Sequence, residues 1–325
     1  YLSFAHTAYK QIITQFYDNE YGGMFWSVHP NGTPASTKKQ AYGIAFSMYG
    51  LSAYYEATKD QAALDKAAEL YSCLEKHFYD PVYGGYIECL GNDFSVIEDV
   101  RLSDKDQNAI KSMNTHLHVI EAYAKLYTVL PSQALKQSVT QLLDIFEQHI
   151  IDPATCQQKL FFEKDWTSTA SVVSYGHDIE AAWLLQEAAI IIKDAWRIEK
   201  FTKFAQSMAS EVAANLSPEG AVYNDYHTHT QVLDKGIDWW PQAEAMVGFL
   251  NVFENSGNTI YLQHSLTSWA VIKNQFKDAK FGEWFWGYDA SGNLLYKEKA
   301  GFWKCPYHNS RACIEVANRI SHLLQ

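Results

Sequence analysis

Polar side chains gather at five points of the chain, each at the start of an otherwise apolar segment. Histidines and carboxylates are frequent among them, and such groups move protons to and from a substrate. The five sets are Gln40 and Tyr42; Asn114, His116 and His118; His177, Asp178 and Glu180; Trp239, Trp240, Gln242 and Glu244; and His308, Asn309 and Arg311. Because a buried helix does not otherwise tolerate so many polar groups, the pattern predicts a pocket that is lined by several helix starts.

The start of a helix favours acid/base chemistry for a physical reason. Its first turn has backbone N–H groups without partners and the positive end of the helix dipole, which together stabilise an anion and disfavour imidazolium. A neutral histidine beside a developing negative charge is arranged for proton transfer. We therefore expect histidine-based proton transfer.

Several of these residues also have a simpler interpretation. His116 and His118 are two residues apart and point to opposite sides of a helix, so one can face a pocket while the other is structural. A metal ion shared by the two is not expected. His177 and Asp178 suit either catalysis or an ordinary N-cap region. Glu180 follows His177 by three residues, where it can orient the imidazole or bind substrate hydroxyls.

Trp240 and Glu244 are one helical turn apart, which suits an acid beside a stacking platform for a sugar, although the pair alone does not decide between that role and a structural one. The sequence has neither the GxSxG motif of a serine nucleophile nor a glycine-rich phosphate loop. Nucleophilic serine chemistry and nucleotide binding are therefore poor candidates.

The helices that must position these groups follow from an internal repeat. Residues 17–26 are echoed at 79–88, and weaker echoes near 152, 217 and 278 give a period of about 60 to 72 residues. Each echo predicts a helix end, a glycine turn and a short strand.

The segments between the echoes are helical and of two kinds. One-faced helices are predicted in 2–16, 64–78, 135–150, 198–212 and 261–276, and helices that are apolar on nearly all sides around 41–49, 181–185 and 245–250. Outer helix, hairpin and inner helix therefore form one unit, and the pattern favours a closed α/α toroid with its hairpins at one mouth. An open helical solenoid is the alternative.

Composition limits the partners. The 325 residues carry a formal net charge of −11 with no basic stripe, which argues against nucleic acid, and no run approaches the roughly 18 apolar residues of a membrane span. Five cysteines form an odd set without a CxxC pair, so a reducing, cytoplasmic location is expected. The aromatic fraction of 15% suits a site that stacks on sugar rings.

Five segments carry a specific resemblance. NTHLHVIEAY (114–123), GHDIEA (176–181), WWPQAEA (239–245), GEWFW (282–286) and GFWKCPYHN (301–309) resemble the cellobiose 2-epimerases of the N-acylglucosamine 2-epimerase superfamily. The resemblance implies an all-α (α/α)6 barrel in one catalytic domain over 1–325. It also implies an isomerase, without cofactor or metal, that epimerises the reducing-end glucose of β-1,4-linked disaccharides such as cellobiose or lactose to mannose.

The resemblance also assigns roles to residues. It places His177 and His308 as the acid/base pair at C2 and His118 in ring opening or binding. The substrate-pocket positions that it matches are Tyr42, Asp106, Asn114, Glu180, Trp240 and Trp303, with Glu244 as a partner. The protein is expected to be a monomer or weak dimer.

The resemblance does not account for the whole barrel. The length is close to five units of about 65 residues, whereas the family has six, and an arginine of an early inner helix would lie upstream of Tyr1. We expect the first helix pair to be missing. The helices near Tyr1 and after His308 then flank an open seam with exposed apolar side chains, or something else covers that seam.

Two other functions remain open. One is an inverting glycoside hydrolase on the same toroid with Glu180 and Glu244 as acid and base. The other is a catalytically silent saccharide-binding protein that uses the aromatic pocket.

Overall fold

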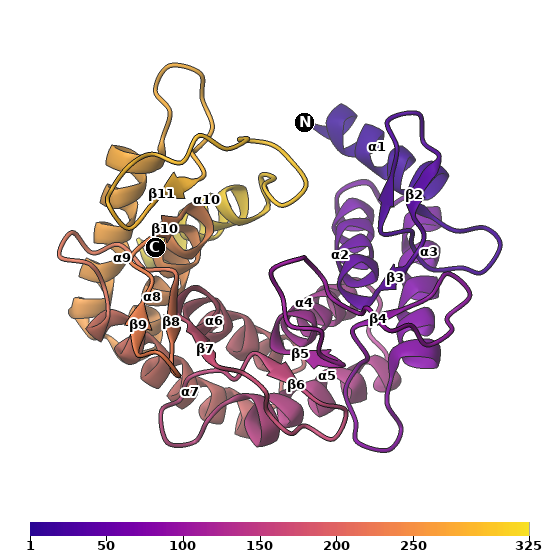
Figure 1. The fold of residues 1–325 in the computed structure, drawn as a ribbon, viewed down its shortest axis with the longest axis horizontal. Coiled ribbons are helices and arrows are strands. Elements are labelled where there is room, and N and C mark those ends of the chain that lie inside the picture. Colours follow the sequence, from indigo (N-terminus) through magenta and orange to yellow (C-terminus); the bar gives the residue numbers. More distant parts are fainter. Residues whose placement is uncertain (325) are drawn as a thin grey trace. The chain divides into compact units, whose positions relative to one another are not determined.

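Five pairs of helices make up the computed structural model, which describes residues 1–324 (Figure 1). The outer helices are α1 (Leu2–Gln11), α3 (Gln61–Cys73), α5 (Gln133–Ile145), α7 (Ala195–Ala214) and α9 (Thr259–Val271). The inner helices are α2 (Ala41–Thr58), α4 (Met113–Val129), α6 (Tyr175–Ile191), α8 (Trp239–Ser256) and α10 (Tyr307–Leu323). The predicted helices, and the position of every polar set at the start of an inner helix, are confirmed.

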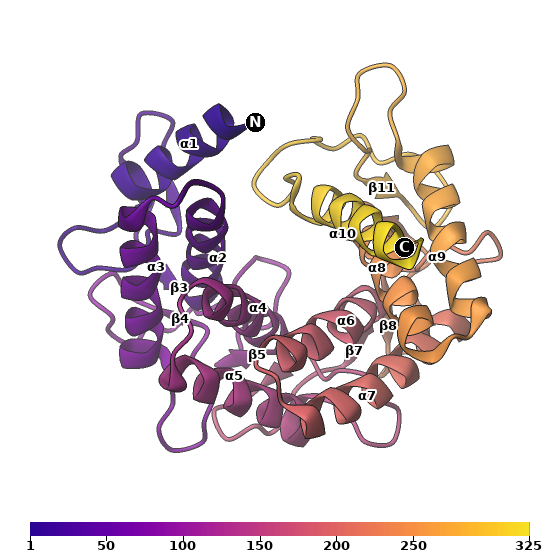
Figure 2. The same ribbon diagram turned by 180° about the vertical axis from the view of Figure 1, so that it is seen from behind.

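The helices belong to two compact units. Unit 1 contains residues 1–150, 159–170 and 188–194, and unit 2 contains 151–158, 171–187 and 195–325. Within unit 1, α2 and α4 lie side by side and α3 and α5 pack against them (Figures 1 and 2). Within unit 2, α8 packs against α7, α9 and α10. A single catalytic domain over 1–325 stays a prediction.

Most outer helices end in a wider, π-helical turn that precedes an aspartate. These turns are η1 (Ile12–Phe16), η2 (Leu74–Phe78), η3 (Phe146–Ile150) and η4 (Ile272–Phe276). Asp18 follows the first of them, and its carboxylate accepts the backbone N–H groups of Glu20 and Tyr21. Asp80 and Asp278 cap their turns in the same way. The repeated sequence motif is therefore a repeated side-chain turn.

Short antiparallel strand pairs hold the starts of the inner helices. The pairs are β3 (Lys39–Gln40) with β4 (Cys89–Leu90), β5 (Lys111–Ser112) with β6 (Phe161–Phe162), β7 (Val172–Ser174) with β8 (Asp225–His227), and β10 (Ile237–Asp238) with β11 (Gly287–Tyr288). Strand β9 (Val232–Leu233) extends the β7–β8 sheet, and β1 (Ser27–Val28) pairs with β2 (Pro34–Ser36). Each of α2, α4, α6 and α8 begins directly after its strand, so the strand pair fixes where the first turn lies.

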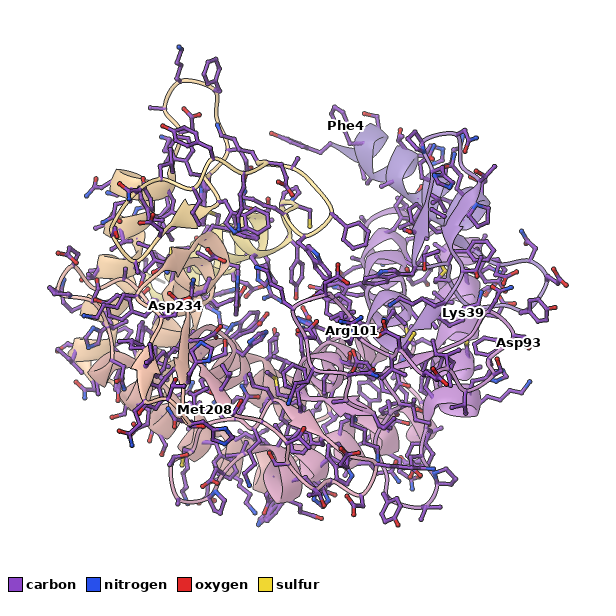
Figure 3. All side chains as sticks on the ribbon, in the orientation of Figure 1. Phe4, Lys39, Asp93, Arg101, Met208 and Asp234 are labelled. Carbon is purple, nitrogen blue, oxygen red and sulfur yellow. The ribbon has the colours of Figure 1, made fainter. Side chains whose placement is uncertain are left out.

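Two of these strands carry buried lysines that bond to the turn aspartates. Lys39, labelled in Figure 3, is fully buried and donates to Asp18 Oδ2 at 2.6 Å. Lys111 is also fully buried and donates to Asp80 Oδ2 at 3.0 Å. A buried charge needs such a partner. The turns after α1 and α3 are thus tied to β3 and β5, the strands that start the next inner helices.

The cores of the units contain the inner helices. Nearly every residue in the first turns of α4 and α8 is buried. Helix α8 approaches α6 closely at Gly248. A Cβ atom at this position would lie only 2.6 Å from the carbonyl oxygen of Ile179. None of the helices in residues 1–324 is both long enough and apolar enough to cross a membrane.

Several helices expose apolar side chains, and α1 and α10 are among them. Phe4 projects from α1 and is 79% exposed (Figure 3), and α10 exposes Ile314 and Ile320. That these helices flank a seam stays a prediction.

Candidate active site

The centre of the site in unit 2 is a histidine bonded to a buried carboxylate. His308 Nδ1 lies 2.7 Å from Oε1 of Glu244. His308 is the second residue of α10, and Glu244 lies on the second turn of α8 with no exposed surface. The bond orients the imidazole through Nδ1.

Arg311 joins this pair to a second carboxylate. Its Nη2 atom donates to Glu244 Oε1 at 2.7 Å and to Glu180 Oε1 at 3.0 Å. Arg311 follows His308 by three residues, so both side chains leave the same face of α10. The other oxygen of Glu244 accepts the indole N–H of Trp183 at 3.0 Å, and the Arg311 guanidinium lies 4.8 Å from that ring. Both oxygens of Glu244 are therefore held by fixed donors.

The charge of this cluster explains the state of Glu244. Burial alone would raise the pKa of its carboxyl group, but the positive charge of Arg311 and the hydrogen bond from His308 outweigh burial and lower that pKa to about 2. Glu244 is thus ionised throughout the neutral range. An ionised carboxylate at Nδ1 stabilises the imidazolium form of His308.

The same residues could be taken for a metal centre. Donor atoms of Glu180, Glu244 and His308 lie within 4.8 Å of one another. The guanidinium of Arg311 already contacts both carboxylates, however, and would repel a metal ion. These residues fit an arginine-bridged acid pair better than a metal site.

The ring of Trp240 lies close to both His177 and His308. Its ring lies 4.7 Å from that of His177 and 5.5 Å from that of His308, measured between centroids. A Cβ atom at Gly176 would lie only 2.5 Å from the Trp240 ring, so glycine is needed there for this approach. His177 Nδ1 is 3.0 Å from the hydroxyl oxygen of Ser174, the last residue of β7. Two imidazoles therefore lie against one indole. Their role in proton transfer stays a prediction.

Asp178 points away from this group. Its Oδ1 atom accepts the backbone N–H of Gln158 at 2.9 Å, and Gln158 Nε2 also donates to the carbonyl of His177. Burial raises the pKa of Asp178 to about 7. Asp178 ties the turn before Gln158 to α6, which agrees with its structural interpretation. The role of His177 stays a prediction.

A second cluster of predicted residues lies in unit 1. His118 is buried on α4, and its Nδ1 atom lies 2.9 Å from Oε2 of Glu121. Tyr42, the second residue of α2, meets the imidazole edge to face at 5.2 Å, and Phe46 lies 4.7 Å from it. Helices α2 and α4 thus bring Tyr42 and His118 together.

His116 is the structural member of its pair. Its Nδ1 atom bonds to the Ser112 carbonyl at 2.6 Å and Nε2 accepts the backbone N–H of Tyr86 at 2.9 Å, so both ring nitrogens are used. Burial lowers the pKa of His116 to about 4 and keeps the ring neutral. The expectation that one of the two histidines is structural is confirmed.

The remaining predicted residues are less closely associated. Asp106 accepts two hydrogen bonds from Ser103 and closes a turn between β4 and β5. Asn114 is half-buried, and its side-chain oxygen, shielded from solvent, has no partner in the described part of the chain. Trp303 is 41% exposed and packs against Phe302 in the loop before α10.

Four side chains that contact the predicted residues were given no role in the sequence analysis: Ser174, Trp183, Glu121 and Arg311. The spacing of three residues from His118 to Glu121 and from His308 to Arg311 is the signal that could have found two of them. The contact of Trp183 with Glu244 joins residues 61 apart, and no local pattern indicates it.

Comparison with known proteins identifies the family of this chain. The profile of the family described as N-acylglucosamine 2-epimerase (GlcNAc 2-epimerase) matches residues 2–312. The chain belongs to this family. It is 43% identical to the cellobiose 2-epimerase of Bacteroides fragilis, over 97% of this chain and 81% of the relative, and 36% identical to that of Dictyoglomus turgidum, over 98% and 82%.

Solved structures of the family have the same fold. The cellobiose 2-epimerase of Bacillus thermoamylovorans aligns with a TM-score of 0.92 at 33% identity, covering 98% of this chain and 81% of that one. The fold class expected from the sequence, an (α/α)6 barrel type with small sheets, fits this family. A family 88 glycosyl hydrolase from Bacteroides vulgatus aligns with a TM-score of 0.59 at 14% identity, a likeness of fold alone. This member of the N-acylglucosamine 2-epimerase family is an isomerase, a carbohydrate epimerase.

Proposed function

We propose that this epimerase inverts C2 of the reducing-end glucose of cellobiose- or lactose-type β-1,4-linked disaccharides and gives mannose. The observation that carries the proposal is the placement of His177 and His308 against one and the same ring, that of Trp240. The five cellobiose 2-epimerases among the curated relatives, at 33% to 43% identity, support the disaccharide as substrate.

The chemistry follows from the acidity of the open-chain sugar. Once the ring opens to an aldehyde, one histidine removes the C2 proton, and the electron pair of the C–H bond forms a cis-enediolate. The other histidine, as imidazolium, returns a proton to C2 on the opposite face. Glu244 stabilises the imidazolium form of His308 through Nδ1, and the indole of Trp240 gives the flat enediolate a stacking surface.

The remaining residues serve substrate handling in this proposal. His118, with Tyr42 beside it, assists ring opening or binds the sugar. Asp106, Asn114 and Trp303 are proposed to contact sugar hydroxyls or rings, and Glu180 holds Arg311 in place. No cofactor or metal takes part in any step.

The carboxylates argue against the hydrolase alternative. An inverting hydrolase needs two carboxyl groups about 6.5–9.5 Å apart, with one of them protonated. A carboxylate oxygen of Glu180 lies within 4.8 Å of one of Glu244, and both carboxylates accept a hydrogen bond from the same guanidinium nitrogen.

Proton NMR of cellobiose with the protein in deuterium oxide tests the proposal. Deuterium at C2 together with a mannose-type signal is the expected result. Free glucose would instead indicate hydrolysis, and line broadening without exchange would indicate a binding protein; either outcome contradicts the proposal.

Single substitutions then test the two histidines. His177→Asn and His308→Asn should each abolish the exchange, whereas His229→Asn, on an exposed loop, should leave it unchanged. Full exchange in either of the first two variants would overturn the acid/base assignment.

A further inference from the structure

We propose that Glu121 is a positioning residue for ring opening, and that it acts through His118. Glu121 Oε2 lies 2.9 Å from Nδ1 of His118, one helical turn earlier on α4. The side chains are only 6% and 4% exposed. A buried carboxylate in direct contact with an imidazole fixes both its tautomer and its orientation.

The surroundings hold this pair in one geometry. On α2, the rings of Tyr42 and Phe46 pack against the imidazole. The charged group one turn further along α4, Lys125, bonds to Glu56 of α2 at 2.6 Å, so its ammonium is directed to another carboxylate. Glu121 therefore accepts the Nδ1–H of His118, and Nε2 is the nitrogen through which this enclosed ring exchanges protons.

This arrangement suits the opening of a cyclic sugar. Neutral His118 takes the proton of the anomeric hydroxyl at Nε2 as the C1–O1 bond becomes a carbonyl. The electron pair of the C1–O5 bond moves to O5, and the imidazolium gives the same proton to O5. The substrate is thereby converted from hemiacetal to hydroxyaldehyde without net gain or loss of atoms. The carboxylate of Glu121 stabilises the imidazolium between the two transfers.

The inference rests on the proposed function, in which the sugar must open before C2 reacts, but it concerns a separate step. Ring opening interconverts the α and β anomers of the substrate, which exchange spectroscopy measures directly. Exchange of the C2 proton for deuterium reports the later step at His177 and His308. The two readouts can therefore fail independently.

Two variants of Glu121 and one control make the test. Glu121→Leu removes the acceptor in a similar volume, and Glu121→Gln keeps an oxygen that can accept Nδ1–H but removes the charge. Glu75→Gln is the control, because Glu75 is another carboxylate of unit 1, bonded to the hydroxyls of Tyr86 and Tyr123 rather than to a histidine. Circular dichroism establishes that each variant is folded.

We expect Glu121→Leu to slow the enzyme-catalysed interconversion of cellobiose anomers by about tenfold or more, through kcat and with little change in KM. Glu121→Gln should fall between this variant and wild type, and Glu75→Gln should match wild type. Nitrogen-15 spectra should show His118 protonated at Nδ1 in wild type and as a mixture of tautomers in Glu121→Leu.

Distinct outcomes overturn the two proposals. A folded Glu121→Leu protein with wild-type anomer interconversion and an unchanged His118 tautomer contradicts the role of Glu121. A lowered affinity with unchanged kcat would also contradict it, because that is the signature of a merely structural or binding residue. Wild-type protein that interconverts anomers but incorporates no deuterium at C2 contradicts the proposed function and leaves the inference about Glu121 standing.

Discussion

His308 Nδ1 and Glu244 Oε1 are 2.7 Å apart, and the same carboxylate oxygen accepts a hydrogen bond from Arg311. Helix α10 is therefore attached to α8 by the same carboxylate that orients the candidate catalytic histidine. A change in the position of α10 must therefore change the geometry of His308. In unit 2, the packing of α10 on α8 and the orientation of His308 depend on the same carboxylate.

Replacement of Glu244 by glutamine should lower kcat for C2 exchange by about a hundredfold, because a neutral amide no longer stabilises the imidazolium form of His308. Glu254→Gln is the matched control: Glu254 lies on the same helix and bonds to another arginine of α10, Arg319, at 2.6 Å. Deuterium incorporation measures both variants. Equal losses in the two would show that the effect comes from a weakened α8–α10 contact and not from the charge at Nδ1.

Loss of Arg311 should destabilise the protein strongly. Arg311→Gln leaves Glu180 and Glu244 as two neighbouring buried carboxylates without this cation, and removal of one partner from a buried ion pair costs about 3–5 kcal/mol. The decrease in the free energy of unfolding should be smaller at low pH, where one of the two carboxylates can take up a proton. Urea unfolding at pH 5 and pH 8 measures it. Arg319→Gln, whose side chain is more exposed, should cost less, and an equal cost would contradict this account of the cluster.

The helices could be predicted from the sequence more completely than the contacts between them. The outer helices have a regular apolar period, and glycine turns mark their ends, so the pattern of residues 64–78 indicates a helix. That pattern does not indicate the π-helical turn of the last five residues, Leu74–Phe78, because a shift of the backbone hydrogen bond leaves the side-chain pattern almost unchanged.

The candidate site divides in the same way. His177 and His308 stand out in the sequence because histidines at helix starts are unusual in apolar surroundings. The bridge from Arg311 to Glu180 joins residues 131 apart, and nothing local to either residue indicates it. Asp106 is assigned to the pocket by resemblance alone, and its carboxylate is used to close a turn with Ser103. Long-range pairing is set by tertiary packing, which a single sequence does not display.

Asp178 should make the stability of the protein depend on pH. Burial raises its pKa from 3.8 to about 7, so the folded state favours the protonated form. The contribution of protonated Asp178 to the free energy of unfolding is fully present when the pH is below the pKa of this residue in the unfolded chain. It is lost as the pH rises from that value toward 7, by at most about 1.4 kcal/mol for each pH unit. Asp178→Asn keeps an acceptor for Gln158 and removes the titration. Its free energy of unfolding should therefore change less than that of wild type between pH 4 and pH 8, and parallel curves for the two proteins would contradict this expectation.

The close approach of α8 to α6 can be tested with a pair of glycines. An added Cβ at Gly248 would lie 2.6 Å from the backbone oxygen of Ile179, which cannot move aside as a flexible side chain can. Gly248→Ala should therefore push the helices apart and cost about 1–3 kcal/mol. Gly50 lies within α2 and has nothing within 4 Å of its Cβ position. Gly50→Ala should stabilise the protein by about 0.5–1 kcal/mol, because alanine is more stable than glycine in a helix interior.

Since α6 carries His177 and α8 carries Trp240, Gly248→Ala should also slow C2 exchange while Gly50→Ala does not. Equal exchange rates in the two variants would show that the distance between these helices does not control the site.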